Sequence, residues 1–233
     1  MGRSSALFGT GTRRSARCTL AETENFILGL DLDGVVADFY GTIRPLAAEW
    51  LGKPLDDLTE SPTYGLHEWG FNGAGSEYPK FHRWAVVQRR LFSSLAPIPG
   101  AAPALRRLSD DKVRIRIITN RLFIPHFHAP AVAQTVEWLD IHGIPYWDLC
   151  LMPDKAAVQA NVYLEDTPKN IDELLAAGAD VIIFENSTNL ATPGTRARDW
   201  SEAEDLIRER LRAFAPRARV PSREELLEES PES

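Results

Sequence analysis

The chain has 233 residues, of which 44% are hydrophobic and 25% are charged, and its formal net charge is −7. This length and composition are those of a globular protein with a full hydrophobic core, built as one large domain or as a core domain with a small insertion. The negative charge argues against a nucleic-acid partner, and every apolar run falls short of the roughly 20 residues that a membrane span requires.

The two ends of the chain differ in composition from its middle. Residues 1–24 are rich in Ser, Gly and Arg and contain no acidic residue before Glu22, so we expect a disordered N-terminal extension there. Residues 216–233 form an acidic, polar C-terminal tail, and we expect neither end to carry chemistry. The only cysteines, Cys18 and Cys150, lie far apart in the sequence. They indicate no disulfide framework, so the expected location is the reducing cytoplasm.

Five short apolar runs predict strands, at residues 26–31, 113–119, 147–151, 161–165 and 180–184. Helical spacing of apolar residues predicts helices at 100–111, 130–143 and 167–178, the last with Thr167 as its N-cap. This alternation predicts an α/β fold, a doubly wound parallel sheet with helices on both faces. The strand at 113–119 fits less well, because Arg114 and Arg116 interrupt a run that should be apolar in a buried parallel strand.

The segment between the first two strands is too long for a single crossover helix. It is rich in aromatic residues and is broken by Gly and Pro. We therefore predict a small helical cap at 40–99 with its own aromatic core, inserted after the first strand. The α/β core then comprises residues 25–39 and 100–215. Asp38 is expected to anchor the hinge of the cap or to cap a helix, and His82 to be an ordinary residue of the cap.

The first strand ends in two aspartates, Asp31 and Asp33, which are followed directly by Gly34. Two interpretations fit this pattern. A solvated turn is one, because Asp and Gly are common turn residues. A site where both carboxylates hold a metal ion or act on a substrate is the other, because buried carboxylates are costly unless a cation or hydrogen bonds compensate them.

Polar residues at the ends of the other strands favour the second interpretation. In an open α/β sheet, ligands bind beyond the carboxyl ends of the strands. The polar residues that follow the strands are Asp31, Asp33, Thr119, Asn120, Lys155, Glu165, Asp166 and Asn170. Each has a structural explanation when taken alone, but together they predict one site. Its several carboxylates predict a hard divalent cation.

The ordered set Asp31-Leu-Asp33-Gly, Thr119, Lys155 and Glu165-Asp166-x-x-x-Asn170 resembles the motifs of the haloacid dehalogenase (HAD) superfamily of aspartate-based phosphohydrolases. Within it, the chain is most similar to the 5′(3′)-deoxyribonucleotidase-like 5′-nucleotidases. The stretches that carry this similarity are LDGVVADFYG (32–41), LFSSLAPIPGA (91–101), IITNRLF (117–123) and YLEDTPKNI (163–171). Asn120 and Glu165 depart from the family pattern, in which Ser and Asp are common at these positions.

The resemblance implies a role for each residue. Asp31 is the nucleophile that forms an aspartyl-phosphate, and Asp33 is the general acid and base. The implied cofactor is Mg²⁺, held by Asp31, the backbone carbonyl of Asp33 and Asp166, while Glu165 and Asn170 orient these ligands. Thr119, Asn120 and Lys155 bind the phosphate, and Phe39 contacts the nucleotide base.

The implied function is Mg²⁺-dependent hydrolysis of a small phosphomonoester, a nucleoside (deoxy)monophosphate. Two alternatives stay open: a phosphatase for a non-nucleotide metabolite, and a catalytically idle module that binds phosphate or a nucleotide. Neither nucleic acid nor a membrane is an expected partner. The oligomeric state is also open, with a homodimer among the alternatives.

Overall fold

A computed structural model of the chain describes residues 25–71, 77–125 and 127–214. The tails predicted at 1–24 and 216–233 lie outside these described residues. Within the described ranges, the structure contains no helix with the length and apolar character of a membrane span.

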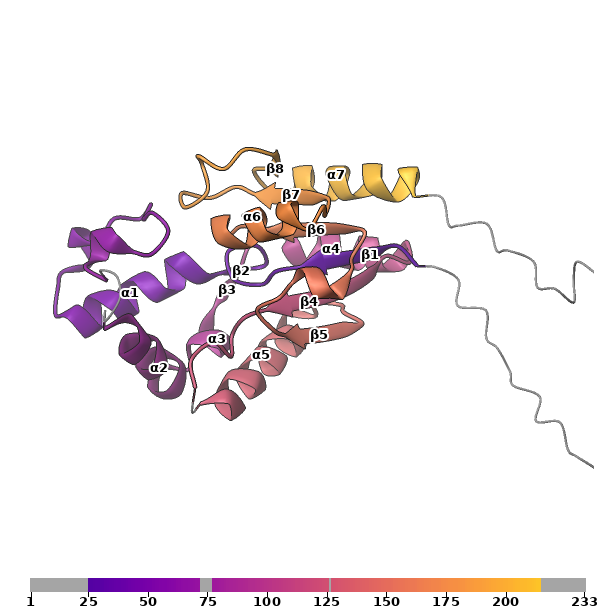
Figure 1. The fold of residues 1–233 in the computed structure, drawn as a ribbon. Helices are drawn as coiled ribbons and strands as arrows, with labels where there is room; N and C mark the ends of the chain where they lie inside the picture. The colour runs from indigo at the N-terminus through magenta and orange to yellow at the C-terminus, as the bar shows by residue number, and fades with distance from the viewer. Residues whose placement is uncertain (1–24, 72–76, 126, 215–233) are drawn as a thin grey trace, which may run out of the picture.

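A six-stranded sheet forms the centre of the fold (Figure 1), with the order β5–β4–β1–β6–β7–β8 and parallel pairing throughout. The strands are β1 (Ile27–Leu30), β4 (Arg114–Thr119), β5 (Asp148–Leu151), β6 (Val162–Glu165), β7 (Val181–Phe184) and β8 (Thr195–Ala197). The five predicted strands are all present, and the sheet adds the short edge strand β8. The predicted fold class is confirmed.

Helices cover both faces of the sheet. On one face lie α4 (Ala101–Asp110), α5 (His128–His142) and α7 (Trp200–Ala213), and on the other lies α6 (Pro168–Ala176). The alternation along β6 shows the two faces, because Val162 and Leu164 belong to the larger buried cluster while Tyr163 packs with the residues of α6. Thr167 stands at the N-cap position of α6, as predicted, although its side chain makes no capping hydrogen bond.

The two arginines of β4 are explained by the neighbouring edge strand. Arg116 lies opposite Asp148 of β5 in the parallel register. The Nε atoms of Arg114 and Arg116 donate to Asp148 Oδ2 at 3.2 and 2.7 Å. Arg116 also donates to the carbonyl of Val158 at 3.1 Å. Polar positions are therefore tolerated on this strand because it lies beside the edge of the sheet, where charged side chains find partners.

The cap lies beyond the carboxyl end of β1 (Figure 1). Its elements are α1 (Phe39–Leu51), the 3₁₀ turns η1 (Leu55–Asp57) and η2 (His67–Trp69), α2 (Tyr78–Arg89) and α3 (Leu91–Ser94). The chain enters through β2 (Ala37–Asp38) and returns through β3 (Ala96–Pro97), which pair with each other as antiparallel strands. Asp38 caps α1 by accepting a hydrogen bond from the Gly41 N–H at 2.9 Å, as the sequence suggested.

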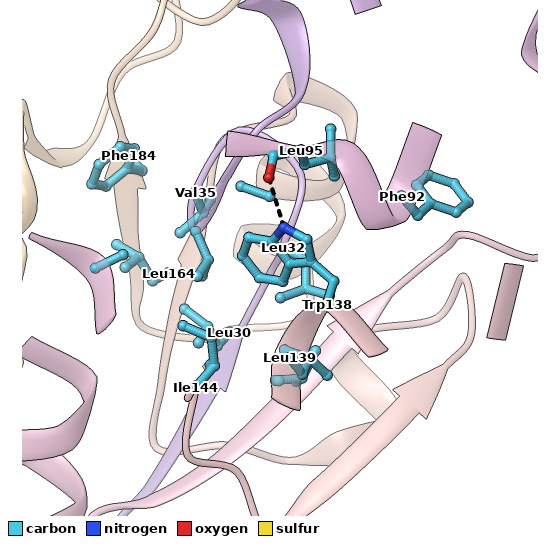
Figure 2. Close-up of a cluster of buried hydrophobic side chains, with 14 of the residues drawn as sticks. Leu30, Leu32, Val35, Phe92, Leu95, Trp138, Leu139, Ile144, Leu164 and Phe184 are labelled. Atoms are coloured by element: carbon cyan, nitrogen blue, oxygen red, sulfur yellow. Dashed lines mark hydrogen bonds between the residues drawn. The ribbon is translucent and has the colours of Figure 1, made fainter. Parts of the chain in front are cut away.

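The aromatic residues of the cap share one buried cluster with the α/β core. Phe81 packs against the cap rings of Phe71 and Trp84, and it belongs to the same contiguous set of buried side chains as Leu28 of β1. The aromatic core expected for the cap is therefore present and continuous with the core of the sheet. Figure 2 shows a central part of this cluster around Trp138 of α5. The indole Nε1 of Trp138 donates to the carbonyl of Leu95 at 2.8 Å, which ties a core helix to the returning segment of the cap (Figure 2).

A short 3₁₀ turn, η3 (Ala156–Val158), completes the described elements between β5 and β6. Lys155 stands at its N-terminal boundary. Lys155 therefore lies at the start of the crossover from β5 to β6, where its amine reaches Asp31 and Glu165 at the carboxyl ends of β1 and β6.

Candidate active site

All of the site residues predicted from the sequence come together at the carboxyl ends of β1, β4 and β6. A cavity of about 330 Å³ opens there. The predicted residues that line it are Asp31, Asp33, Phe39, Thr119, Asn120, Lys155 and Asn170. The remaining two, Glu165 and Asp166, are buried, and each lies close enough to Asp31 to share a metal ion with it. The cavity lies between this edge of the sheet and the cap, which contributes Tyr64 and Leu66.

The tight loop after β1 explains the sequence Asp-Leu-Asp-Gly. The N–H groups of Val36 and Ala37 both donate to the Leu32 carbonyl at 2.9 Å, and the Gly34 N–H donates to the Ala37 carbonyl at 2.9 Å. Gly34 has φ +88°, and a Cβ there would lie 2.1 Å from Asp166 Oδ2. Only glycine permits both the positive φ and this close approach. The glycine therefore lets the loop pass directly beside Asp166, which shares a carboxylate cluster with Asp31.

Lys155 forms the centre of the buried charge cluster. Its Nζ lies 2.7 Å from Asp31 Oδ1 and 2.5 Å from Glu165 Oε2, and all three side chains are less than a tenth exposed. Burial opposes the charged ammonium, but the nearby charges of Asp31 and Glu165 outweigh it and hold the pKa of Lys155 above its usual value. Lys155 is therefore a permanent cation beside Asp31.

One ammonium does not compensate the carboxylates around it. Burial, followed by the charge of Glu165, raises the pKa of Asp31 to about 7. Burial, followed by the charges of Asp31 and Glu165, raises the pKa of Asp166 well above its usual range. These shifts mean that the cluster carries more negative charge than the protein alone stabilises.

The donor set of this cluster fits a magnesium ion. Asp31, Glu165 and Asp166 each offer one oxygen, and these oxygens lie within 4.8 Å of one another. Hard divalent cations prefer such carboxylate oxygens, and their charge would offset the excess described above. Glu165 already accepts from Lys155 through Oε2, and through Oε1 from the N–H groups of Asp166 and Thr167 and from Asn170 Nδ2. Asp31 and Asp166 are therefore the carboxylates better placed to bind the ion.

Two asparagines that the sequence analysis missed hold Asp166 in place. Asn186 Nδ2 donates to Asp166 Oδ2 at 2.7 Å, and Asn189 Nδ2 donates to the Asp166 carbonyl at 2.8 Å. Both residues lie in the loop that follows β7. They follow the strand predicted at 180–184, so the pattern of polar residues after each strand also points to them.

Arg121 is a third residue that the sequence analysis missed. It follows Thr119 and Asn120 after β4, and its side chain is 1% exposed. Its Nε and Nη2 donate to the two carboxylate oxygens of Asp33 at 3.0 and 2.6 Å. Asp33 is 88 residues away from Arg121 in the sequence, so no local sequence pattern predicts this ion pair.

His82 is not the ordinary cap residue that the sequence suggested. It lines the cavity from α2, is 1% exposed, and packs against the rings of Phe39, Phe92 and Phe123. Its Nδ1 is a buried atom without a hydrogen-bond partner in the described part of the chain. Burial lowers the pKa of His82 to about 4, so the ring is neutral at neutral pH. The cavity is thus lined by carboxylates at the ends of the strands and by aromatic rings that come mainly from the cap.

The fold of the chain is similar to solved proteins of the HAD type. A haloacid dehalogenase-like hydrolase from Streptococcus pneumoniae matches with a TM-score of 0.55 and 13% identity, over 78% of this chain and 98% of that one. A phosphonoacetaldehyde hydrolase-like protein from Oleispira antarctica matches with a TM-score of 0.55 and 13% identity, over 81% and 93% of the two chains. At this level of identity the comparison establishes the fold alone.

Sequence comparison identifies the family. A curated protein from Chlorobaculum tepidum is 51% identical over 198 residues, which are 85% of this chain and 98% of the relative, and it carries the provisional name 5′(3′)-deoxyribonucleotidase. The family model described as "5′ nucleotidase, deoxy (Pyrimidine), cytosolic type C protein" matches residues 25–214. The match spans the α/β core and the cap together. The resemblance carried by the motifs is confirmed: this chain is a HAD-type hydrolase and belongs to the family of cytosolic type C 5′-nucleotidases.

Proposed function

We propose that this enzyme hydrolyses nucleoside (deoxy)monophosphates in the cytoplasm, through an aspartyl-phosphate on Asp31 and with Mg²⁺ as cofactor. The observation that carries the proposal is the arrangement of the cavity. Asp31 and Lys155 line it from the ends of the strands, beside the carboxylates that could hold a metal ion, while aromatic rings line it mainly from the cap. A phosphate group and a flat heterocyclic base, joined by a sugar, have the same distribution of charge and apolar surface.

Formation of the covalent intermediate uses the groups at the end of β1. An oxygen of Asp31 attacks phosphorus, and the bond between phosphorus and the ester oxygen breaks. Asp33, two residues further along the same loop, gives a proton to the departing alkoxide. Lys155, 2.7 Å from Asp31, offsets the negative charge that nucleophile and phosphate bring together.

Hydrolysis of the intermediate returns the enzyme to its starting state. Asp33, now a carboxylate, takes a proton from the water that attacks phosphorus, the bond between phosphorus and the Asp31 oxygen breaks, and inorganic phosphate leaves. Thr119 and Asn120 line the cavity beside Asp31, where their polar groups would hold the phosphate oxygens. When bound to Asp31, Asp166 and the Asp33 carbonyl, Mg²⁺ would supply positive charge that stabilises the phosphoryl group during transfer.

The proposal is tested by following phosphate release over a panel of 5′- and 3′-nucleoside monophosphates, both ribo and deoxy, and sugar phosphates. We expect the nucleotides to be the best substrates, and Asp31→Asn to abolish turnover while the protein stays folded, because the amide is nearly isosteric but is no nucleophile. Preference for sugar phosphates would favour a metabolite phosphatase. Absence of turnover with bound nucleotide would favour an idle binding module.

Phe39 provides a test of the nucleotide assignment itself. Its ring lines the cavity at the start of α1, directly after the hinge strand β2. Stacking of one base on an aromatic ring contributes about 1–3 kcal/mol. Phe39→Ala should therefore raise the KM for a nucleoside monophosphate about ten-fold or more, and raise the KM for a small aryl phosphate less.

Trp147→Ala is the control for this experiment, because Trp147 is an exposed aromatic residue before β5 that does not line the cavity. We expect it to leave both KM values unchanged. If Phe39→Ala raised the KM of the two substrates by the same factor, Phe39 would be part of the scaffold and the assignment to nucleotides would lose its main support.

A further inference from the structure

Arg121 makes a two-point contact with Asp33 inside the cavity wall. The Nε and Nη2 atoms reach one carboxylate oxygen each, at 3.0 and 2.6 Å. A planar guanidinium that contacts both oxygens fixes the rotation of the carboxylate as well as its position. The Asp33 side chain is 23% exposed, so it still faces the cavity. A carboxylate has about four lone-pair sites, and lone pairs therefore remain for a substrate or a water.

The guanidinium group is itself held from two further sides. Its Nη1 donates to Thr135 Oγ1 of α5 at 3.0 Å. The Thr135 hydroxyl in turn donates to the Ala131 carbonyl at 2.7 Å, so its orientation is fixed. The ring of Phe92, on α3 of the cap, lies 4.2 Å from the guanidinium carbon. Arg121 thus connects a core helix and the cap to the side chain of Asp33.

We propose that Arg121 is a positioning residue for the general acid and base: it holds the Asp33 carboxylate in the orientation that proton transfer to the leaving oxygen requires. The proposal rests on the proposed function, because it assigns Arg121 a part in the same reaction. Neither the motifs nor the family description assigns a role to this arginine. Its burial and three-sided contacts distinguish it from a surface ion pair, which is free to rotate.

Substrates with different leaving groups provide a readout that a structural role would not change. A nucleoside monophosphate releases an alkoxide, which needs the proton from Asp33 as the P–O bond breaks. p-Nitrophenyl phosphate releases a stabilised phenolate, which leaves without protonation. The value of kcat/KM reports events up to release of the leaving group, so misplacement of Asp33 lowers it for the nucleotide and much less for the aryl ester.

The experiment compares Arg121→Met, Arg121→Lys and the control Arg114→Met on both substrates. Misplacement of a catalytic group by about 1 Å costs about 100-fold in rate. We therefore expect Arg121→Met to lower kcat/KM for the nucleotide about 100-fold, with a loss below about ten-fold for the aryl ester. The kcat/KM of Arg121→Lys for the nucleotide should lie between the values of Arg121→Met and the wild type, because an ammonium keeps the charge but does not make two parallel hydrogen bonds. Arg114 also pairs with an aspartate, Asp148, but outside the cavity, so Arg114→Met should change neither value.

A double-mutant cycle separates positioning from direct contact with the substrate. If Arg121 acts through Asp33, then Arg121→Met has no further effect on nucleotide hydrolysis in an Asp33→Asn background. If Arg121→Met does not fold, Thr135→Val replaces it, because it removes a support of Arg121 without touching Asp33. Equal losses on the two substrates, or a full additional loss in the Asp33→Asn background, would overturn the inference. A wild-type protein that hydrolyses neither substrate would instead refute the proposed function.

Discussion

His82 is a titratable side chain in an aromatic environment. Besides Phe39, Phe92 and Phe123, the rings of Tyr78 and Phe127 lie within 6.2 Å of its ring. Burial is the main cause that lowers its pKa to about 4; nearby Asp33 opposes this shift, and Arg121 adds to it. The ordinary value is 6.5. Because the unfolded chain binds the proton more tightly than the folded protein, the unfolding free energy falls as the pH drops from 6.5 towards 4.

We predict that His82→Phe removes this pH dependence and stabilises the protein at neutral pH. Phenylalanine fits an aromatic environment and eliminates the unpartnered Nδ1, whose burial costs about 1–3 kcal/mol. Denaturant unfolding at pH 7 and pH 5 measures both effects. The exposed His67 of the cap provides the control, His67→Phe, which should retain the wild-type slope. If wild type and His82→Phe lost the same unfolding free energy between the two pH values, burial of a neutral His82 would be contradicted.

At the scale of single elements, the loop after β1 depends on the first residue of α7. Trp200 Nε1 donates to the Val35 carbonyl at 2.8 Å, and both residues are buried. The helix is fixed in turn by Asp199, whose carboxylate accepts from the N–H groups of Ser201 and Glu202 at 2.9 Å. The position of the loop that carries Asp31 and Asp33 is therefore set in part by a helix more than 160 residues away in sequence.

We predict that Trp200→Phe lowers both stability and activity. The substitution leaves the buried Val35 carbonyl without a donor, at a cost of about 1–3 kcal/mol. It also loosens the loop, so kcat/KM should fall about ten-fold or more. Trp138→Phe is the matched control, because it removes an equivalent bond to the Leu95 carbonyl at the return of the cap. Thermal unfolding midpoints and kcat/KM values of both variants test this prediction. If the two variants were equally stable and lost the same activity, the inference that Trp200 positions the catalytic loop would be refuted.

The elements show what the sequence could predict and what it could not. Strands β1, β4 and β6 are predicted from their apolar runs. The grouping of Asp31, Thr119 and Glu165 is then predicted because the carboxyl ends of parallel strands meet at one edge of the sheet. Strand β8 has only the residues Thr-Arg-Ala, and pairing with β7 rather than local preference makes it a strand. Arg121 and His82 acquire their roles from partners on distant elements. Their environments are set by tertiary packing, which the periodicity of apolar residues in the sequence does not predict.

At the scale of the whole molecule, the buried acids couple metal binding to stability. Asp31, Glu165 and Asp166 meet in the interior of the fold, and burial together with their mutual charges raises the pKa values of Asp31 and Asp166. Without a cation, this repulsion opposes folding. A ligand that binds only the folded state at 100 times its Kd adds about 2.7 kcal/mol to the unfolding free energy. Mg²⁺ should therefore raise the thermal unfolding midpoint, and a chelator should lower it together with the activity.

Asp166 and Glu165 are neighbours in the sequence, yet we predict opposite effects on the metal-free protein. Asp166→Asn removes one of the repelling charges without changing shape, so it should raise the unfolding midpoint in chelator and abolish the further rise with Mg²⁺. Glu165→Gln instead weakens a buried ion pair with Lys155, so it should lower the midpoint in chelator while much of the rise with Mg²⁺ remains. Thermal unfolding of both variants, with and without Mg²⁺, tests this directly. Loss of the magnesium effect in Glu165→Gln and its retention in Asp166→Asn would show that Glu165, and not Asp166, binds the ion.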